Sequence, residues 1–176
     1  MERLLSEARE ISRIDANLDD EERTDVQLDA LLAALVESFR LRNGDSAIQF
    51  DLALADAKVT VKASADRLTQ VFENLIDNAI SFSPPSGRVT VALRTSGGNA
   101  EVTVADEGPG IPEEHRERIF RRFFSYRPDD RTGSGHTGLG LALVRSIVES
   151  LGGTIDAKPR SGGGTKMVML LPLASR

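Results

Sequence analysis

Apolar residues recur at helical spacing in three long stretches of the chain. Within residues 28–41, 65–82 and 138–151 the apolar positions follow steps of three and four. Such steps place the apolar side chains on one face of a helix, so these segments are predicted to be amphipathic helices with a buried face. Glycine-rich or proline-rich sequence follows each of them, as is typical of helix ends.

Alternation of apolar and polar residues predicts short strands in the remainder. The predicted strands are 24–28, 48–54, 59–61, 89–93, 100–105, 154–157 and 166–171. Glycine-containing turns connect the fourth to the fifth and the sixth to the seventh, which indicates two β-hairpins. The dense apolar run 167–173 contains Pro172, which indicates a buried edge or terminal strand. Hairpins need no helical crossover, so the pattern predicts an α+β two-layer sandwich: a mixed sheet covered on one face by three helices.

A further apolar stripe lies at the N-terminus, at Leu4, Ala8, Ile11, Ile14 and Leu18. Its helical spacing predicts a helix that packs on another chain or a missing segment, or that folds back on its own domain. An acidic stretch follows at 19–22. We therefore expect residues 1–22 to be a helical stub with a linker, and residues 23–176 to form one domain.

Composition excludes several classes of site. The chain has 176 residues, no cysteine, two histidines and a net charge of −5. Thiol chemistry is impossible, a histidine-rich zinc site is not expected, and nucleic-acid binding is not expected. No apolar run approaches the ~20 residues of a transmembrane helix and no signal peptide opens the chain, so we expect a cytoplasmic protein without direct membrane insertion. Six arginines against three acids in 116–131 suit a small polyanion, or a solvated basic helix end.

Asn74 and Asn78 are four residues apart, so they project from one face of the second predicted helix. Mg²⁺ prefers oxygen ligands and needs only one or two side chains when phosphates complete its shell. The spacing therefore suits a magnesium site, although an isolated pair of this kind is more often a solvated helix face.

Asp106-Glu-Gly108-Pro-Gly110 directly follows a predicted strand. An aspartate carboxylate only accepts hydrogen bonds, and the exocyclic amine of adenine is a donor. The glycines permit positive φ and a close approach of the backbone to a ligand. By itself the sequence is also that of an ordinary turn.

The run Gly133-Ser-Gly135-His-Thr-Gly138 matches G-x-G-x-x-G, but loop sequence precedes it where a dinucleotide fold requires a strand. The interpretation that remains is a flexible loop leading into a helix N-terminus, where free N–H groups and the helix dipole attract phosphate.

These segments together resemble the catalytic, ATP-binding domain of bacterial sensor histidine kinases, within the wider group that includes the gyrase and MutL ATPase domains. The similarity covers about residues 24–173. It lies in five segments in the family's order, namely 73–79, 106–112, 119–124, 135–141 and 162–165. Ser81-Phe-Ser-Pro-Pro85 further resembles the cell-envelope and acid-sensing kinases of alpha-proteobacteria. The resemblance implies the Bergerat ATP-binding fold.

The resemblance also implies roles for single residues. Asp106 would bind the adenine amine, Asn74 and Asn78 would hold Mg²⁺ and phosphate, Arg122 would contact the γ-phosphate, and 121–137 would form a lid over ATP. Asn74 and Arg122 are the expected catalytic residues, because phosphoryl transfer needs mainly positioning and charge neutralisation. The implied nucleotide contacts are Asn74, Asn78, Ser81, Phe82, Asp106, Gly108, Gly110, Ile111, Arg122, Gly135, His136, Thr137, Gly138, Leu139, Gly140, Leu141 and Thr165.

One position separates kinases from ATPases in this group. In the hydrolytic relatives, the residue four before the magnesium asparagine is a glutamate that activates water. Here that residue is Asn74, and Glu73 is rotated by about 100° around the helix. The sequence therefore favours transfer to another nucleophile over hydrolysis. Ser81 stands where the family often has a lysine that reaches toward phosphate, so the loss of this charge is expected to lower the affinity unless Arg127 or Arg131 compensates. Phe82 stands where the family often has tyrosine, so stacking is retained and the hydroxyl is lost.

No acceptor histidine of the family's kind is present, since His115 and His136 lie outside any dimerisation helix. Residues 1–18 resemble the end of the second dimerisation helix. We therefore expect a fragment that binds Mg-ATP and donates its γ-phosphate to a histidine on a dimerisation and phosphoacceptor domain. The resemblance further implies that the parent protein is an inner-membrane sensor, through which a response regulator is reached. The alternatives are a nucleotide-binding regulatory module, that is a pseudokinase, and a free-standing ATPase.

Overall fold

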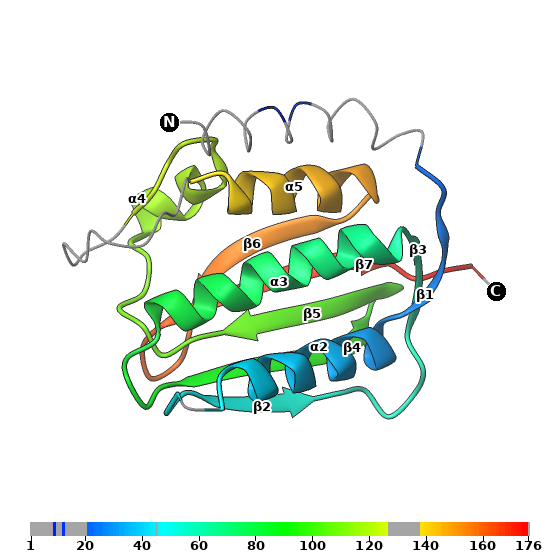
Figure 1. Cartoon of the computed structure of the whole chain (residues 1–176). Helices are drawn as coiled ribbons and strands as arrows, with labels where there is room; N and C mark the ends of the chain where they lie inside the picture. Colours follow the sequence, from blue (N-terminus) through cyan, green and yellow to red (C-terminus); the bar gives the residue numbers. More distant parts are fainter. Residues whose placement is uncertain (1–8, 10–11, 13–20, 45, 127–137, 176) are drawn as a thin grey trace.

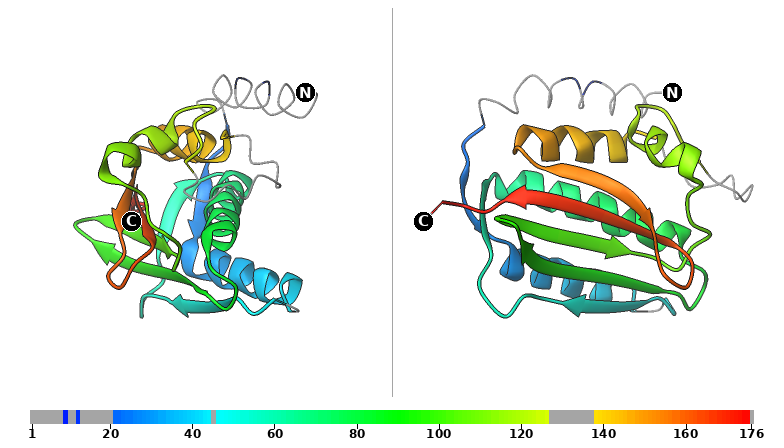
Figure 2. Two further views of the ribbon diagram at one scale, coloured as in Figure 1. Left: turned by 90° about the vertical axis from the view of Figure 1, so that its left-hand side faces the viewer. Right: turned by 180° about the vertical axis from the view of Figure 1, so that it is seen from behind.

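The alternating segments build one five-stranded sheet, and three amphipathic helices cover one of its faces (Figures 1 and 2). The structure is a computed structural model that describes residues 9, 12, 21–44, 46–126 and 138–175. The strand order is β2-β4-β5-β7-β6, with β2 parallel to β4 and the other pairs antiparallel. The predicted α+β two-layer sandwich with a mixed sheet is confirmed.

The sheet strands are β2 (Gln49–Ala53), β4 (Arg88–Ser96), β5 (Asn99–Ala105), β6 (Thr154–Pro159) and β7 (Thr165–Pro172). β7 is the last strand of the chain, yet it lies inside the sheet between β5 and β6, so the option of an edge strand was wrong. Pro172 is tolerated there because it is the final residue of the strand, where its missing N–H interrupts no further pairing.

Two of the predicted strands leave this sheet. β1 (Thr24–Gln27) and β3 (Thr60–Ala63) pair with each other in a separate antiparallel ribbon, in which Val26 stands opposite Val61. Both valines are buried, so the ribbon closes one end of the core. β3 leads directly into α3, and the ribbon therefore fixes where that helix begins.

The three covering helices are α2 (Leu28–Arg42), α3 (Ala65–Phe82) and α5 (Gly140–Ser150). α3 begins where Ser64 accepts a hydrogen bond from the backbone N–H of Arg67, which is the usual role of a serine N-cap. α5 begins two residues later than predicted, because Gly138 has φ +71° and cannot belong to a right-handed helix. The short α4 (Glu113–Arg116) and a 3-10 turn, η1 (Arg118–Phe120), precede it.

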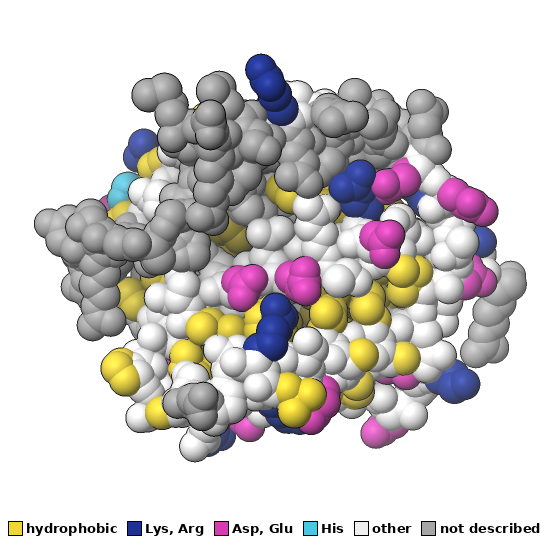
Figure 3. Space-filling view, in the orientation of Figure 1, with side chains coloured by type: hydrophobic (Ala, Val, Ile, Leu, Met, Phe, Trp, Pro, Cys, Tyr) yellow, Lys and Arg dark blue, Asp and Glu magenta, His cyan; other side chains and the backbone are white. Residues whose placement is uncertain are grey.

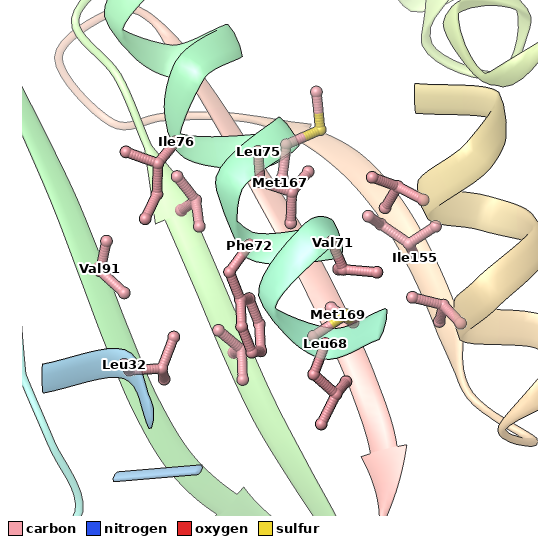
Figure 4. Close-up of a cluster of buried hydrophobic side chains, with 14 of the residues drawn as sticks. Leu32, Leu68, Val71, Phe72, Leu75, Ile76, Val91, Ile155, Met167 and Met169 are labelled. Carbon is pink, nitrogen blue, oxygen red and sulfur yellow. The ribbon is translucent and has the colours of Figure 1, made fainter. Parts of the chain in front are cut away.

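α3 is the central element of the hydrophobic core. Its apolar side chains point toward the strands of the sheet, as Figure 4 shows for Leu68, Val71, Phe72, Leu75 and Ile76. Burying each large side chain stabilises the fold by about 1.5–3 kcal/mol. This packing fixes the rotation of α3 about its axis, and with it the direction of the polar residues between the apolar ones.

Of the predicted N-terminal helix, Arg9 and Ser12 are described; both are helical and exposed, and the rest of residues 1–20 lies outside the described part. The following residues lie on the domain: Arg67 donates two hydrogen bonds of 3.0 Å to Glu21, and Arg23 donates one to the carbonyl of Ser150. None of the described helices is both long and apolar enough to cross a membrane.

Candidate functional site

Asp106 is the most deeply buried charged residue of the described chain, with 5% of its surface exposed. It follows the end of β5, and its backbone N–H donates to the carbonyl of Thr165 in β7. Its Oδ1 accepts hydrogen bonds from the N–H of Gly108 at 2.8 Å and of Thr165 at 3.4 Å. Within the described residues Oδ2 receives no such bond, so one carboxylate oxygen is held by the fold and the other can accept from a ligand.

Burial raises the pKa of the Asp106 carboxyl above its usual value, because the charged form loses its hydration. The two backbone hydrogen bonds and the positive charge of Arg160 act in the opposite direction. These contacts stabilise the buried carboxylate in its charged form. Groups with a perturbed pKa of this kind occur more often at functional sites than elsewhere.

Glycines let three segments close around this aspartate. A Cβ placed on Gly164 would lie 1.9 Å from the Asp106 carbonyl oxygen, and one on Gly108 would lie 2.6 Å from the Phe82 carbonyl oxygen. Neither position can carry a side chain without moving the backbone. The residues after β5, the end of α3 and the turn before β7 therefore meet at Asp106.

Asn74 faces the start of α5. Its Nδ2 donates to the carbonyl of Gln70 at 2.9 Å, and its Oδ1 would lie 2.9 Å from a Cβ placed on Gly140. The first N–H groups of a helix have no partner within it, so the N-terminus of α5 can bind an anion. The Asn74 oxygen beside it can bind the cation that accompanies this anion. Asn78 is half-buried one turn further along α3.

Glu73 lies on the other side of α3, toward α2, where its carboxylate is 3.9 Å from the guanidinium of Arg42. On the face of the molecule that carries α2 and α3, acidic and basic side chains stand among apolar ones (Figure 3). Glu73 and Asn74 thus point to different neighbours, as the helical rotation predicts. Among the described residues no group of three or more His, Asp or Glu could hold a metal, so a cation near Asn74 would depend on amide oxygens and on phosphate.

The segment before the undescribed residues 127–137 is joined to the segment after them. The N–H of Phe123 donates to the carbonyl of Gly138 at 3.0 Å, and both residues have positive φ. A Cβ on Gly138 would lie 2.9 Å from the Phe124 carbonyl oxygen, so glycine is required there. The predicted contacts Gly135, His136 and Thr137 lie outside the described residues.

The other predicted contact residues differ in their burial. Arg122 is exposed beyond η1, whereas Ser81 and Phe82 are half-buried at the last turn of α3. Ile111 and Leu141 are partly buried against the core, and Gly110 has φ +80°. Leu139 belongs to the core, with 3% of its surface exposed, so a nucleotide could reach it only through its backbone.

His115 has a structural setting. Its ring centroid lies 4.6 Å from that of Tyr126 and 5.7 Å from that of Phe124. His115 therefore packs between two aromatic side chains. Three residues at the site were given no role by the sequence analysis, namely Glu107, Arg160 and Gly164. Glu107 and Gly164 lie in the recognised segments 106–112 and 162–165, whereas no sequence signal pointed to Arg160.

Comparison with known proteins decides the family. Residues 63–175, well over half of the chain, match the model of the histidine kinase-, DNA gyrase B- and HSP90-like ATPases. The chain belongs to this family. The matched residues include α3, α5 and the strands β4, β5, β6 and β7 of the main sheet.

The chain is similar to several sensor kinases of this family. The chain is 37% identical over 185 residues to the sensor protein ChvG of Rhizobium meliloti, covering 98% of this chain and 32% of ChvG. Its structure matches a mycobacterial sensor histidine kinase, MprB, with a TM-score of 0.74, 30% identity and coverage of 88% and 99%. It also matches full-length ShkA in complex with AMPPNP, with a TM-score of 0.75, 26% identity and coverage of 93% and 35%.

The chain thus has the fold of a histidine kinase ATP-binding domain. It spans about a third of the length of ChvG, and the structure of MprB that it matches is covered almost completely. The similarity therefore describes one domain of such proteins.

Proposed function

We propose that this domain binds Mg-ATP and donates the γ-phosphate to a histidine on a dimerisation and phosphoacceptor domain, as one step of two-component signalling. In that step the bond between the γ-phosphorus and the bridging oxygen to the β-phosphate breaks, a bond from an imidazole nitrogen to phosphorus forms, and ADP leaves. Such transfer depends on positioning and charge neutralisation, so the proposal concerns residues that bind and orient.

The observation that carries the proposal is the setting of Asp106. A buried carboxylate whose Oδ1 already accepts two backbone hydrogen bonds presents its second oxygen to a donor from outside. The adenine amine is such a donor, and it is the group by which a carboxylate can select adenine. The complex of the related ShkA with AMPPNP, an adenine nucleotide, agrees with this choice of ligand.

The phosphates would extend from Asp106 toward the start of α5. There the Asn74 amide oxygen faces Gly140, and the helix N-terminus favours negative charge. The amide oxygens of Asn74 and Asn78 fit Mg²⁺, which accepts few protein ligands when phosphates supply the rest. Bound Mg²⁺ would neutralise phosphate charge, and Arg122 would add a second cation near the γ-phosphate.

Transfer rather than hydrolysis is favoured by the direction of Glu73. A general base must lie within hydrogen-bond reach of the water that it activates. Glu73 is directed to Arg42 of α2, whereas Asn74, which faces α5, is an amide and cannot accept a proton from water. If the domain were a pseudokinase, no phosphate would be transferred. If it were an ATPase, it would release phosphate steadily.

The wider assignment rests on family membership. We propose that the parent protein is a cytoplasmic-facing sensor kinase anchored in the inner membrane, whose phosphohistidine serves a response regulator. The similarity to ChvG, a sensor protein, supports this role.

The direct experiment supplies the missing acceptor. The chain is incubated with Mg²⁺ and ATP labelled at the γ-phosphate, with and without the dimerisation domain of its parent protein. We expect acid-labile label on the acceptor domain only, and none when its histidine is replaced. Label on the chain alone, or phosphate release in multiple turnovers without label on the acceptor, would overturn the proposal.

A further inference from the structure

Arg160 and Glu107 join three loops next to Asp106. The Arg160 Nη2 donates to Glu107 Oε1 at 2.9 Å, and the other oxygen, Oε2, accepts from the backbone N–H of Arg88 at 3.0 Å. The second guanidinium nitrogen, Nη1, donates to the carbonyl of Gly163 at 2.9 Å. The two side chains therefore connect the residue after Asp106 with the start of β4 and with the turn between β6 and β7.

The turn held by Arg160 has little of its own to fix it. Residues 162–164 are three glycines, all with positive φ. Two backbone hydrogen bonds of 3.1 Å close the turn, from the N–H of Arg160 to Gly164 and from the N–H of Gly163 to Arg160. Since glycine restricts the backbone least of all residues, the side chain of Arg160 supplies the constraint that the sequence of the turn lacks.

Movement of this turn reaches Asp106 directly. Gly164 lies so close to the Asp106 carbonyl that a Cβ would overlap it. The backbone of the next residue, Thr165, makes two hydrogen bonds with Asp106: its carbonyl accepts from the Asp106 N–H, and its N–H donates to the Asp106 carboxylate. The position of the turn therefore sets the direction of the carboxylate oxygen that remains for a ligand.

We propose that the Arg160–Glu107 ion pair is a positioning pair for adenine recognition, which holds the Asp106 carboxylate in line with the exocyclic amine of the nucleotide. This inference rests on the proposed nucleotide function. Neither residue needs to touch the nucleotide. The charge of Arg160 acts in the same sense, because it lowers the pKa of Asp106 against the effect of burial and so favours the carboxylate that accepts the amine.

A solely structural role is the competing explanation, and ligand selectivity separates the two. Both side chains are partly exposed, at 27% and 35%, and ion pairs of this kind contribute little to global stability. We therefore expect the Arg160→Gln and Glu107→Gln variants to remain folded. The matched control is Arg94→Gln, which removes the ion pair between the exposed Arg94 and the largely covered Glu101 at the other end of β4 and β5.

The test measures dissociation constants of the full chain, with Mg²⁺, for ATP and for purine riboside triphosphate, which lacks the amine. Arg160→Gln and Glu107→Gln should each weaken ATP binding roughly fivefold, the effect of misaligning one hydrogen bond. Binding of purine riboside triphosphate should change by less than about twofold. The double variant should be no worse than either single variant, since both changes break one pair, and Arg160→Lys should restore part of the loss.

Three results would be decisive. Equal losses for the two nucleotides would show a general structural role, and ATP binding unchanged from that of the Arg94→Gln control would show no role; either result overturns the positioning proposal alone. A wild-type chain that binds neither nucleotide, or that does not prefer ATP, would overturn the proposed function and the inference that rests on it.

Discussion

The amide oxygen of Asn74 lies against Gly140, the first residue of α5, where a Cβ would be only 2.9 Å away. The contact joins the polar side of α3 to a helix N-terminus, and the adjoining Nδ2 is held by the carbonyl of Gln70. The orientation of the amide is therefore fixed from both ends, with its oxygen directed to the place where we expect phosphate and Mg²⁺.

Gly140→Ala tests this contact. The added methyl group would force the Asn74 side chain away, and we expect Mg-ATP affinity to fall roughly tenfold, the loss of one charge-assisted contact. Stability should change little, because alanine favours a helix over glycine. Calorimetric titration gives the affinity. In an Asn74→Ala background the same change should have no further effect; an equal loss in both backgrounds would contradict the account.

Glu73→Gln tests the preference for transfer over hydrolysis. Because Glu73 is directed to Arg42, its loss should leave Mg-ATP affinity and the slow basal release of phosphate within about twofold of the wild-type values, a difference of well under 1 kcal/mol. A coupled phosphate assay measures the release. A large drop in a substantial wild-type rate would identify Glu73 as a general base and favour the ATPase alternative.

Gly164→Ala should disrupt the site more than its neighbour Gly163→Ala. Both glycines have positive φ, at +102° and +96°, so both substitutions strain the backbone by ~1–3 kcal/mol. Only at 164 would the Cβ also overlap Asp106, whereas at 163 nothing lies within 4 Å. Urea unfolding should therefore show a clearly larger loss of stability for Gly164→Ala, with nucleotide binding abolished. Equal effects would show that backbone strain alone determines the result.

Asp106 should also make stability depend on pH. Burial raises the pKa of Asp106 in the folded state. At pH values between the ordinary aspartate pKa of about 3.9 and this raised pKa, the folded state therefore binds the proton more tightly than the unfolded state does. Stability contributed by this group is therefore full at low pH and is lost as pH rises through that window. The Asp106→Asn variant lacks this loss, while its Oδ1 can still accept the two backbone hydrogen bonds.

Urea unfolding at a series of pH values measures this effect. The stability of Asp106→Asn relative to wild type should increase as pH rises from about 4 and then level off. A difference between the two proteins that does not vary with pH would mean that burial does not perturb the ionisation of Asp106.

The helices of the domain were predictable because their apolar stripes are long. Residues 65–82 were bounded correctly at both ends, as Ser64 and Ser83 flank them. The start of α5 was not, because the sequence does not reveal the positive φ of Gly138. The strands and hairpins followed from alternation, although β4 extends over Arg88–Ser96 where only 89–93 was predicted. β1 and β3 lie in a ribbon of their own, since alternation specifies which face is buried and not which strand is the partner.

The site was predictable only in its local motifs. Asp106, Asn74 and Asn78 belong to short segments whose chemistry can be recognised within a few residues. The Arg160–Glu107 pair spans 53 positions of sequence, and its two members meet only because β5 and β7 are neighbours in the sheet. The close contact of Gly164 with Asp106 has the same origin.

The binding of Mg-ATP by wild type and by Asp106→Asn, measured by calorimetry, tests the central claim most directly. We predict saturable binding with one site per chain for the wild type, and an affinity weakened roughly ten- to hundredfold in the folded variant, the cost of one hydrogen bond to a charged group. Equal affinities in the two proteins, or no binding by the wild type, would contradict the assignment of this buried carboxylate as the adenine-binding group.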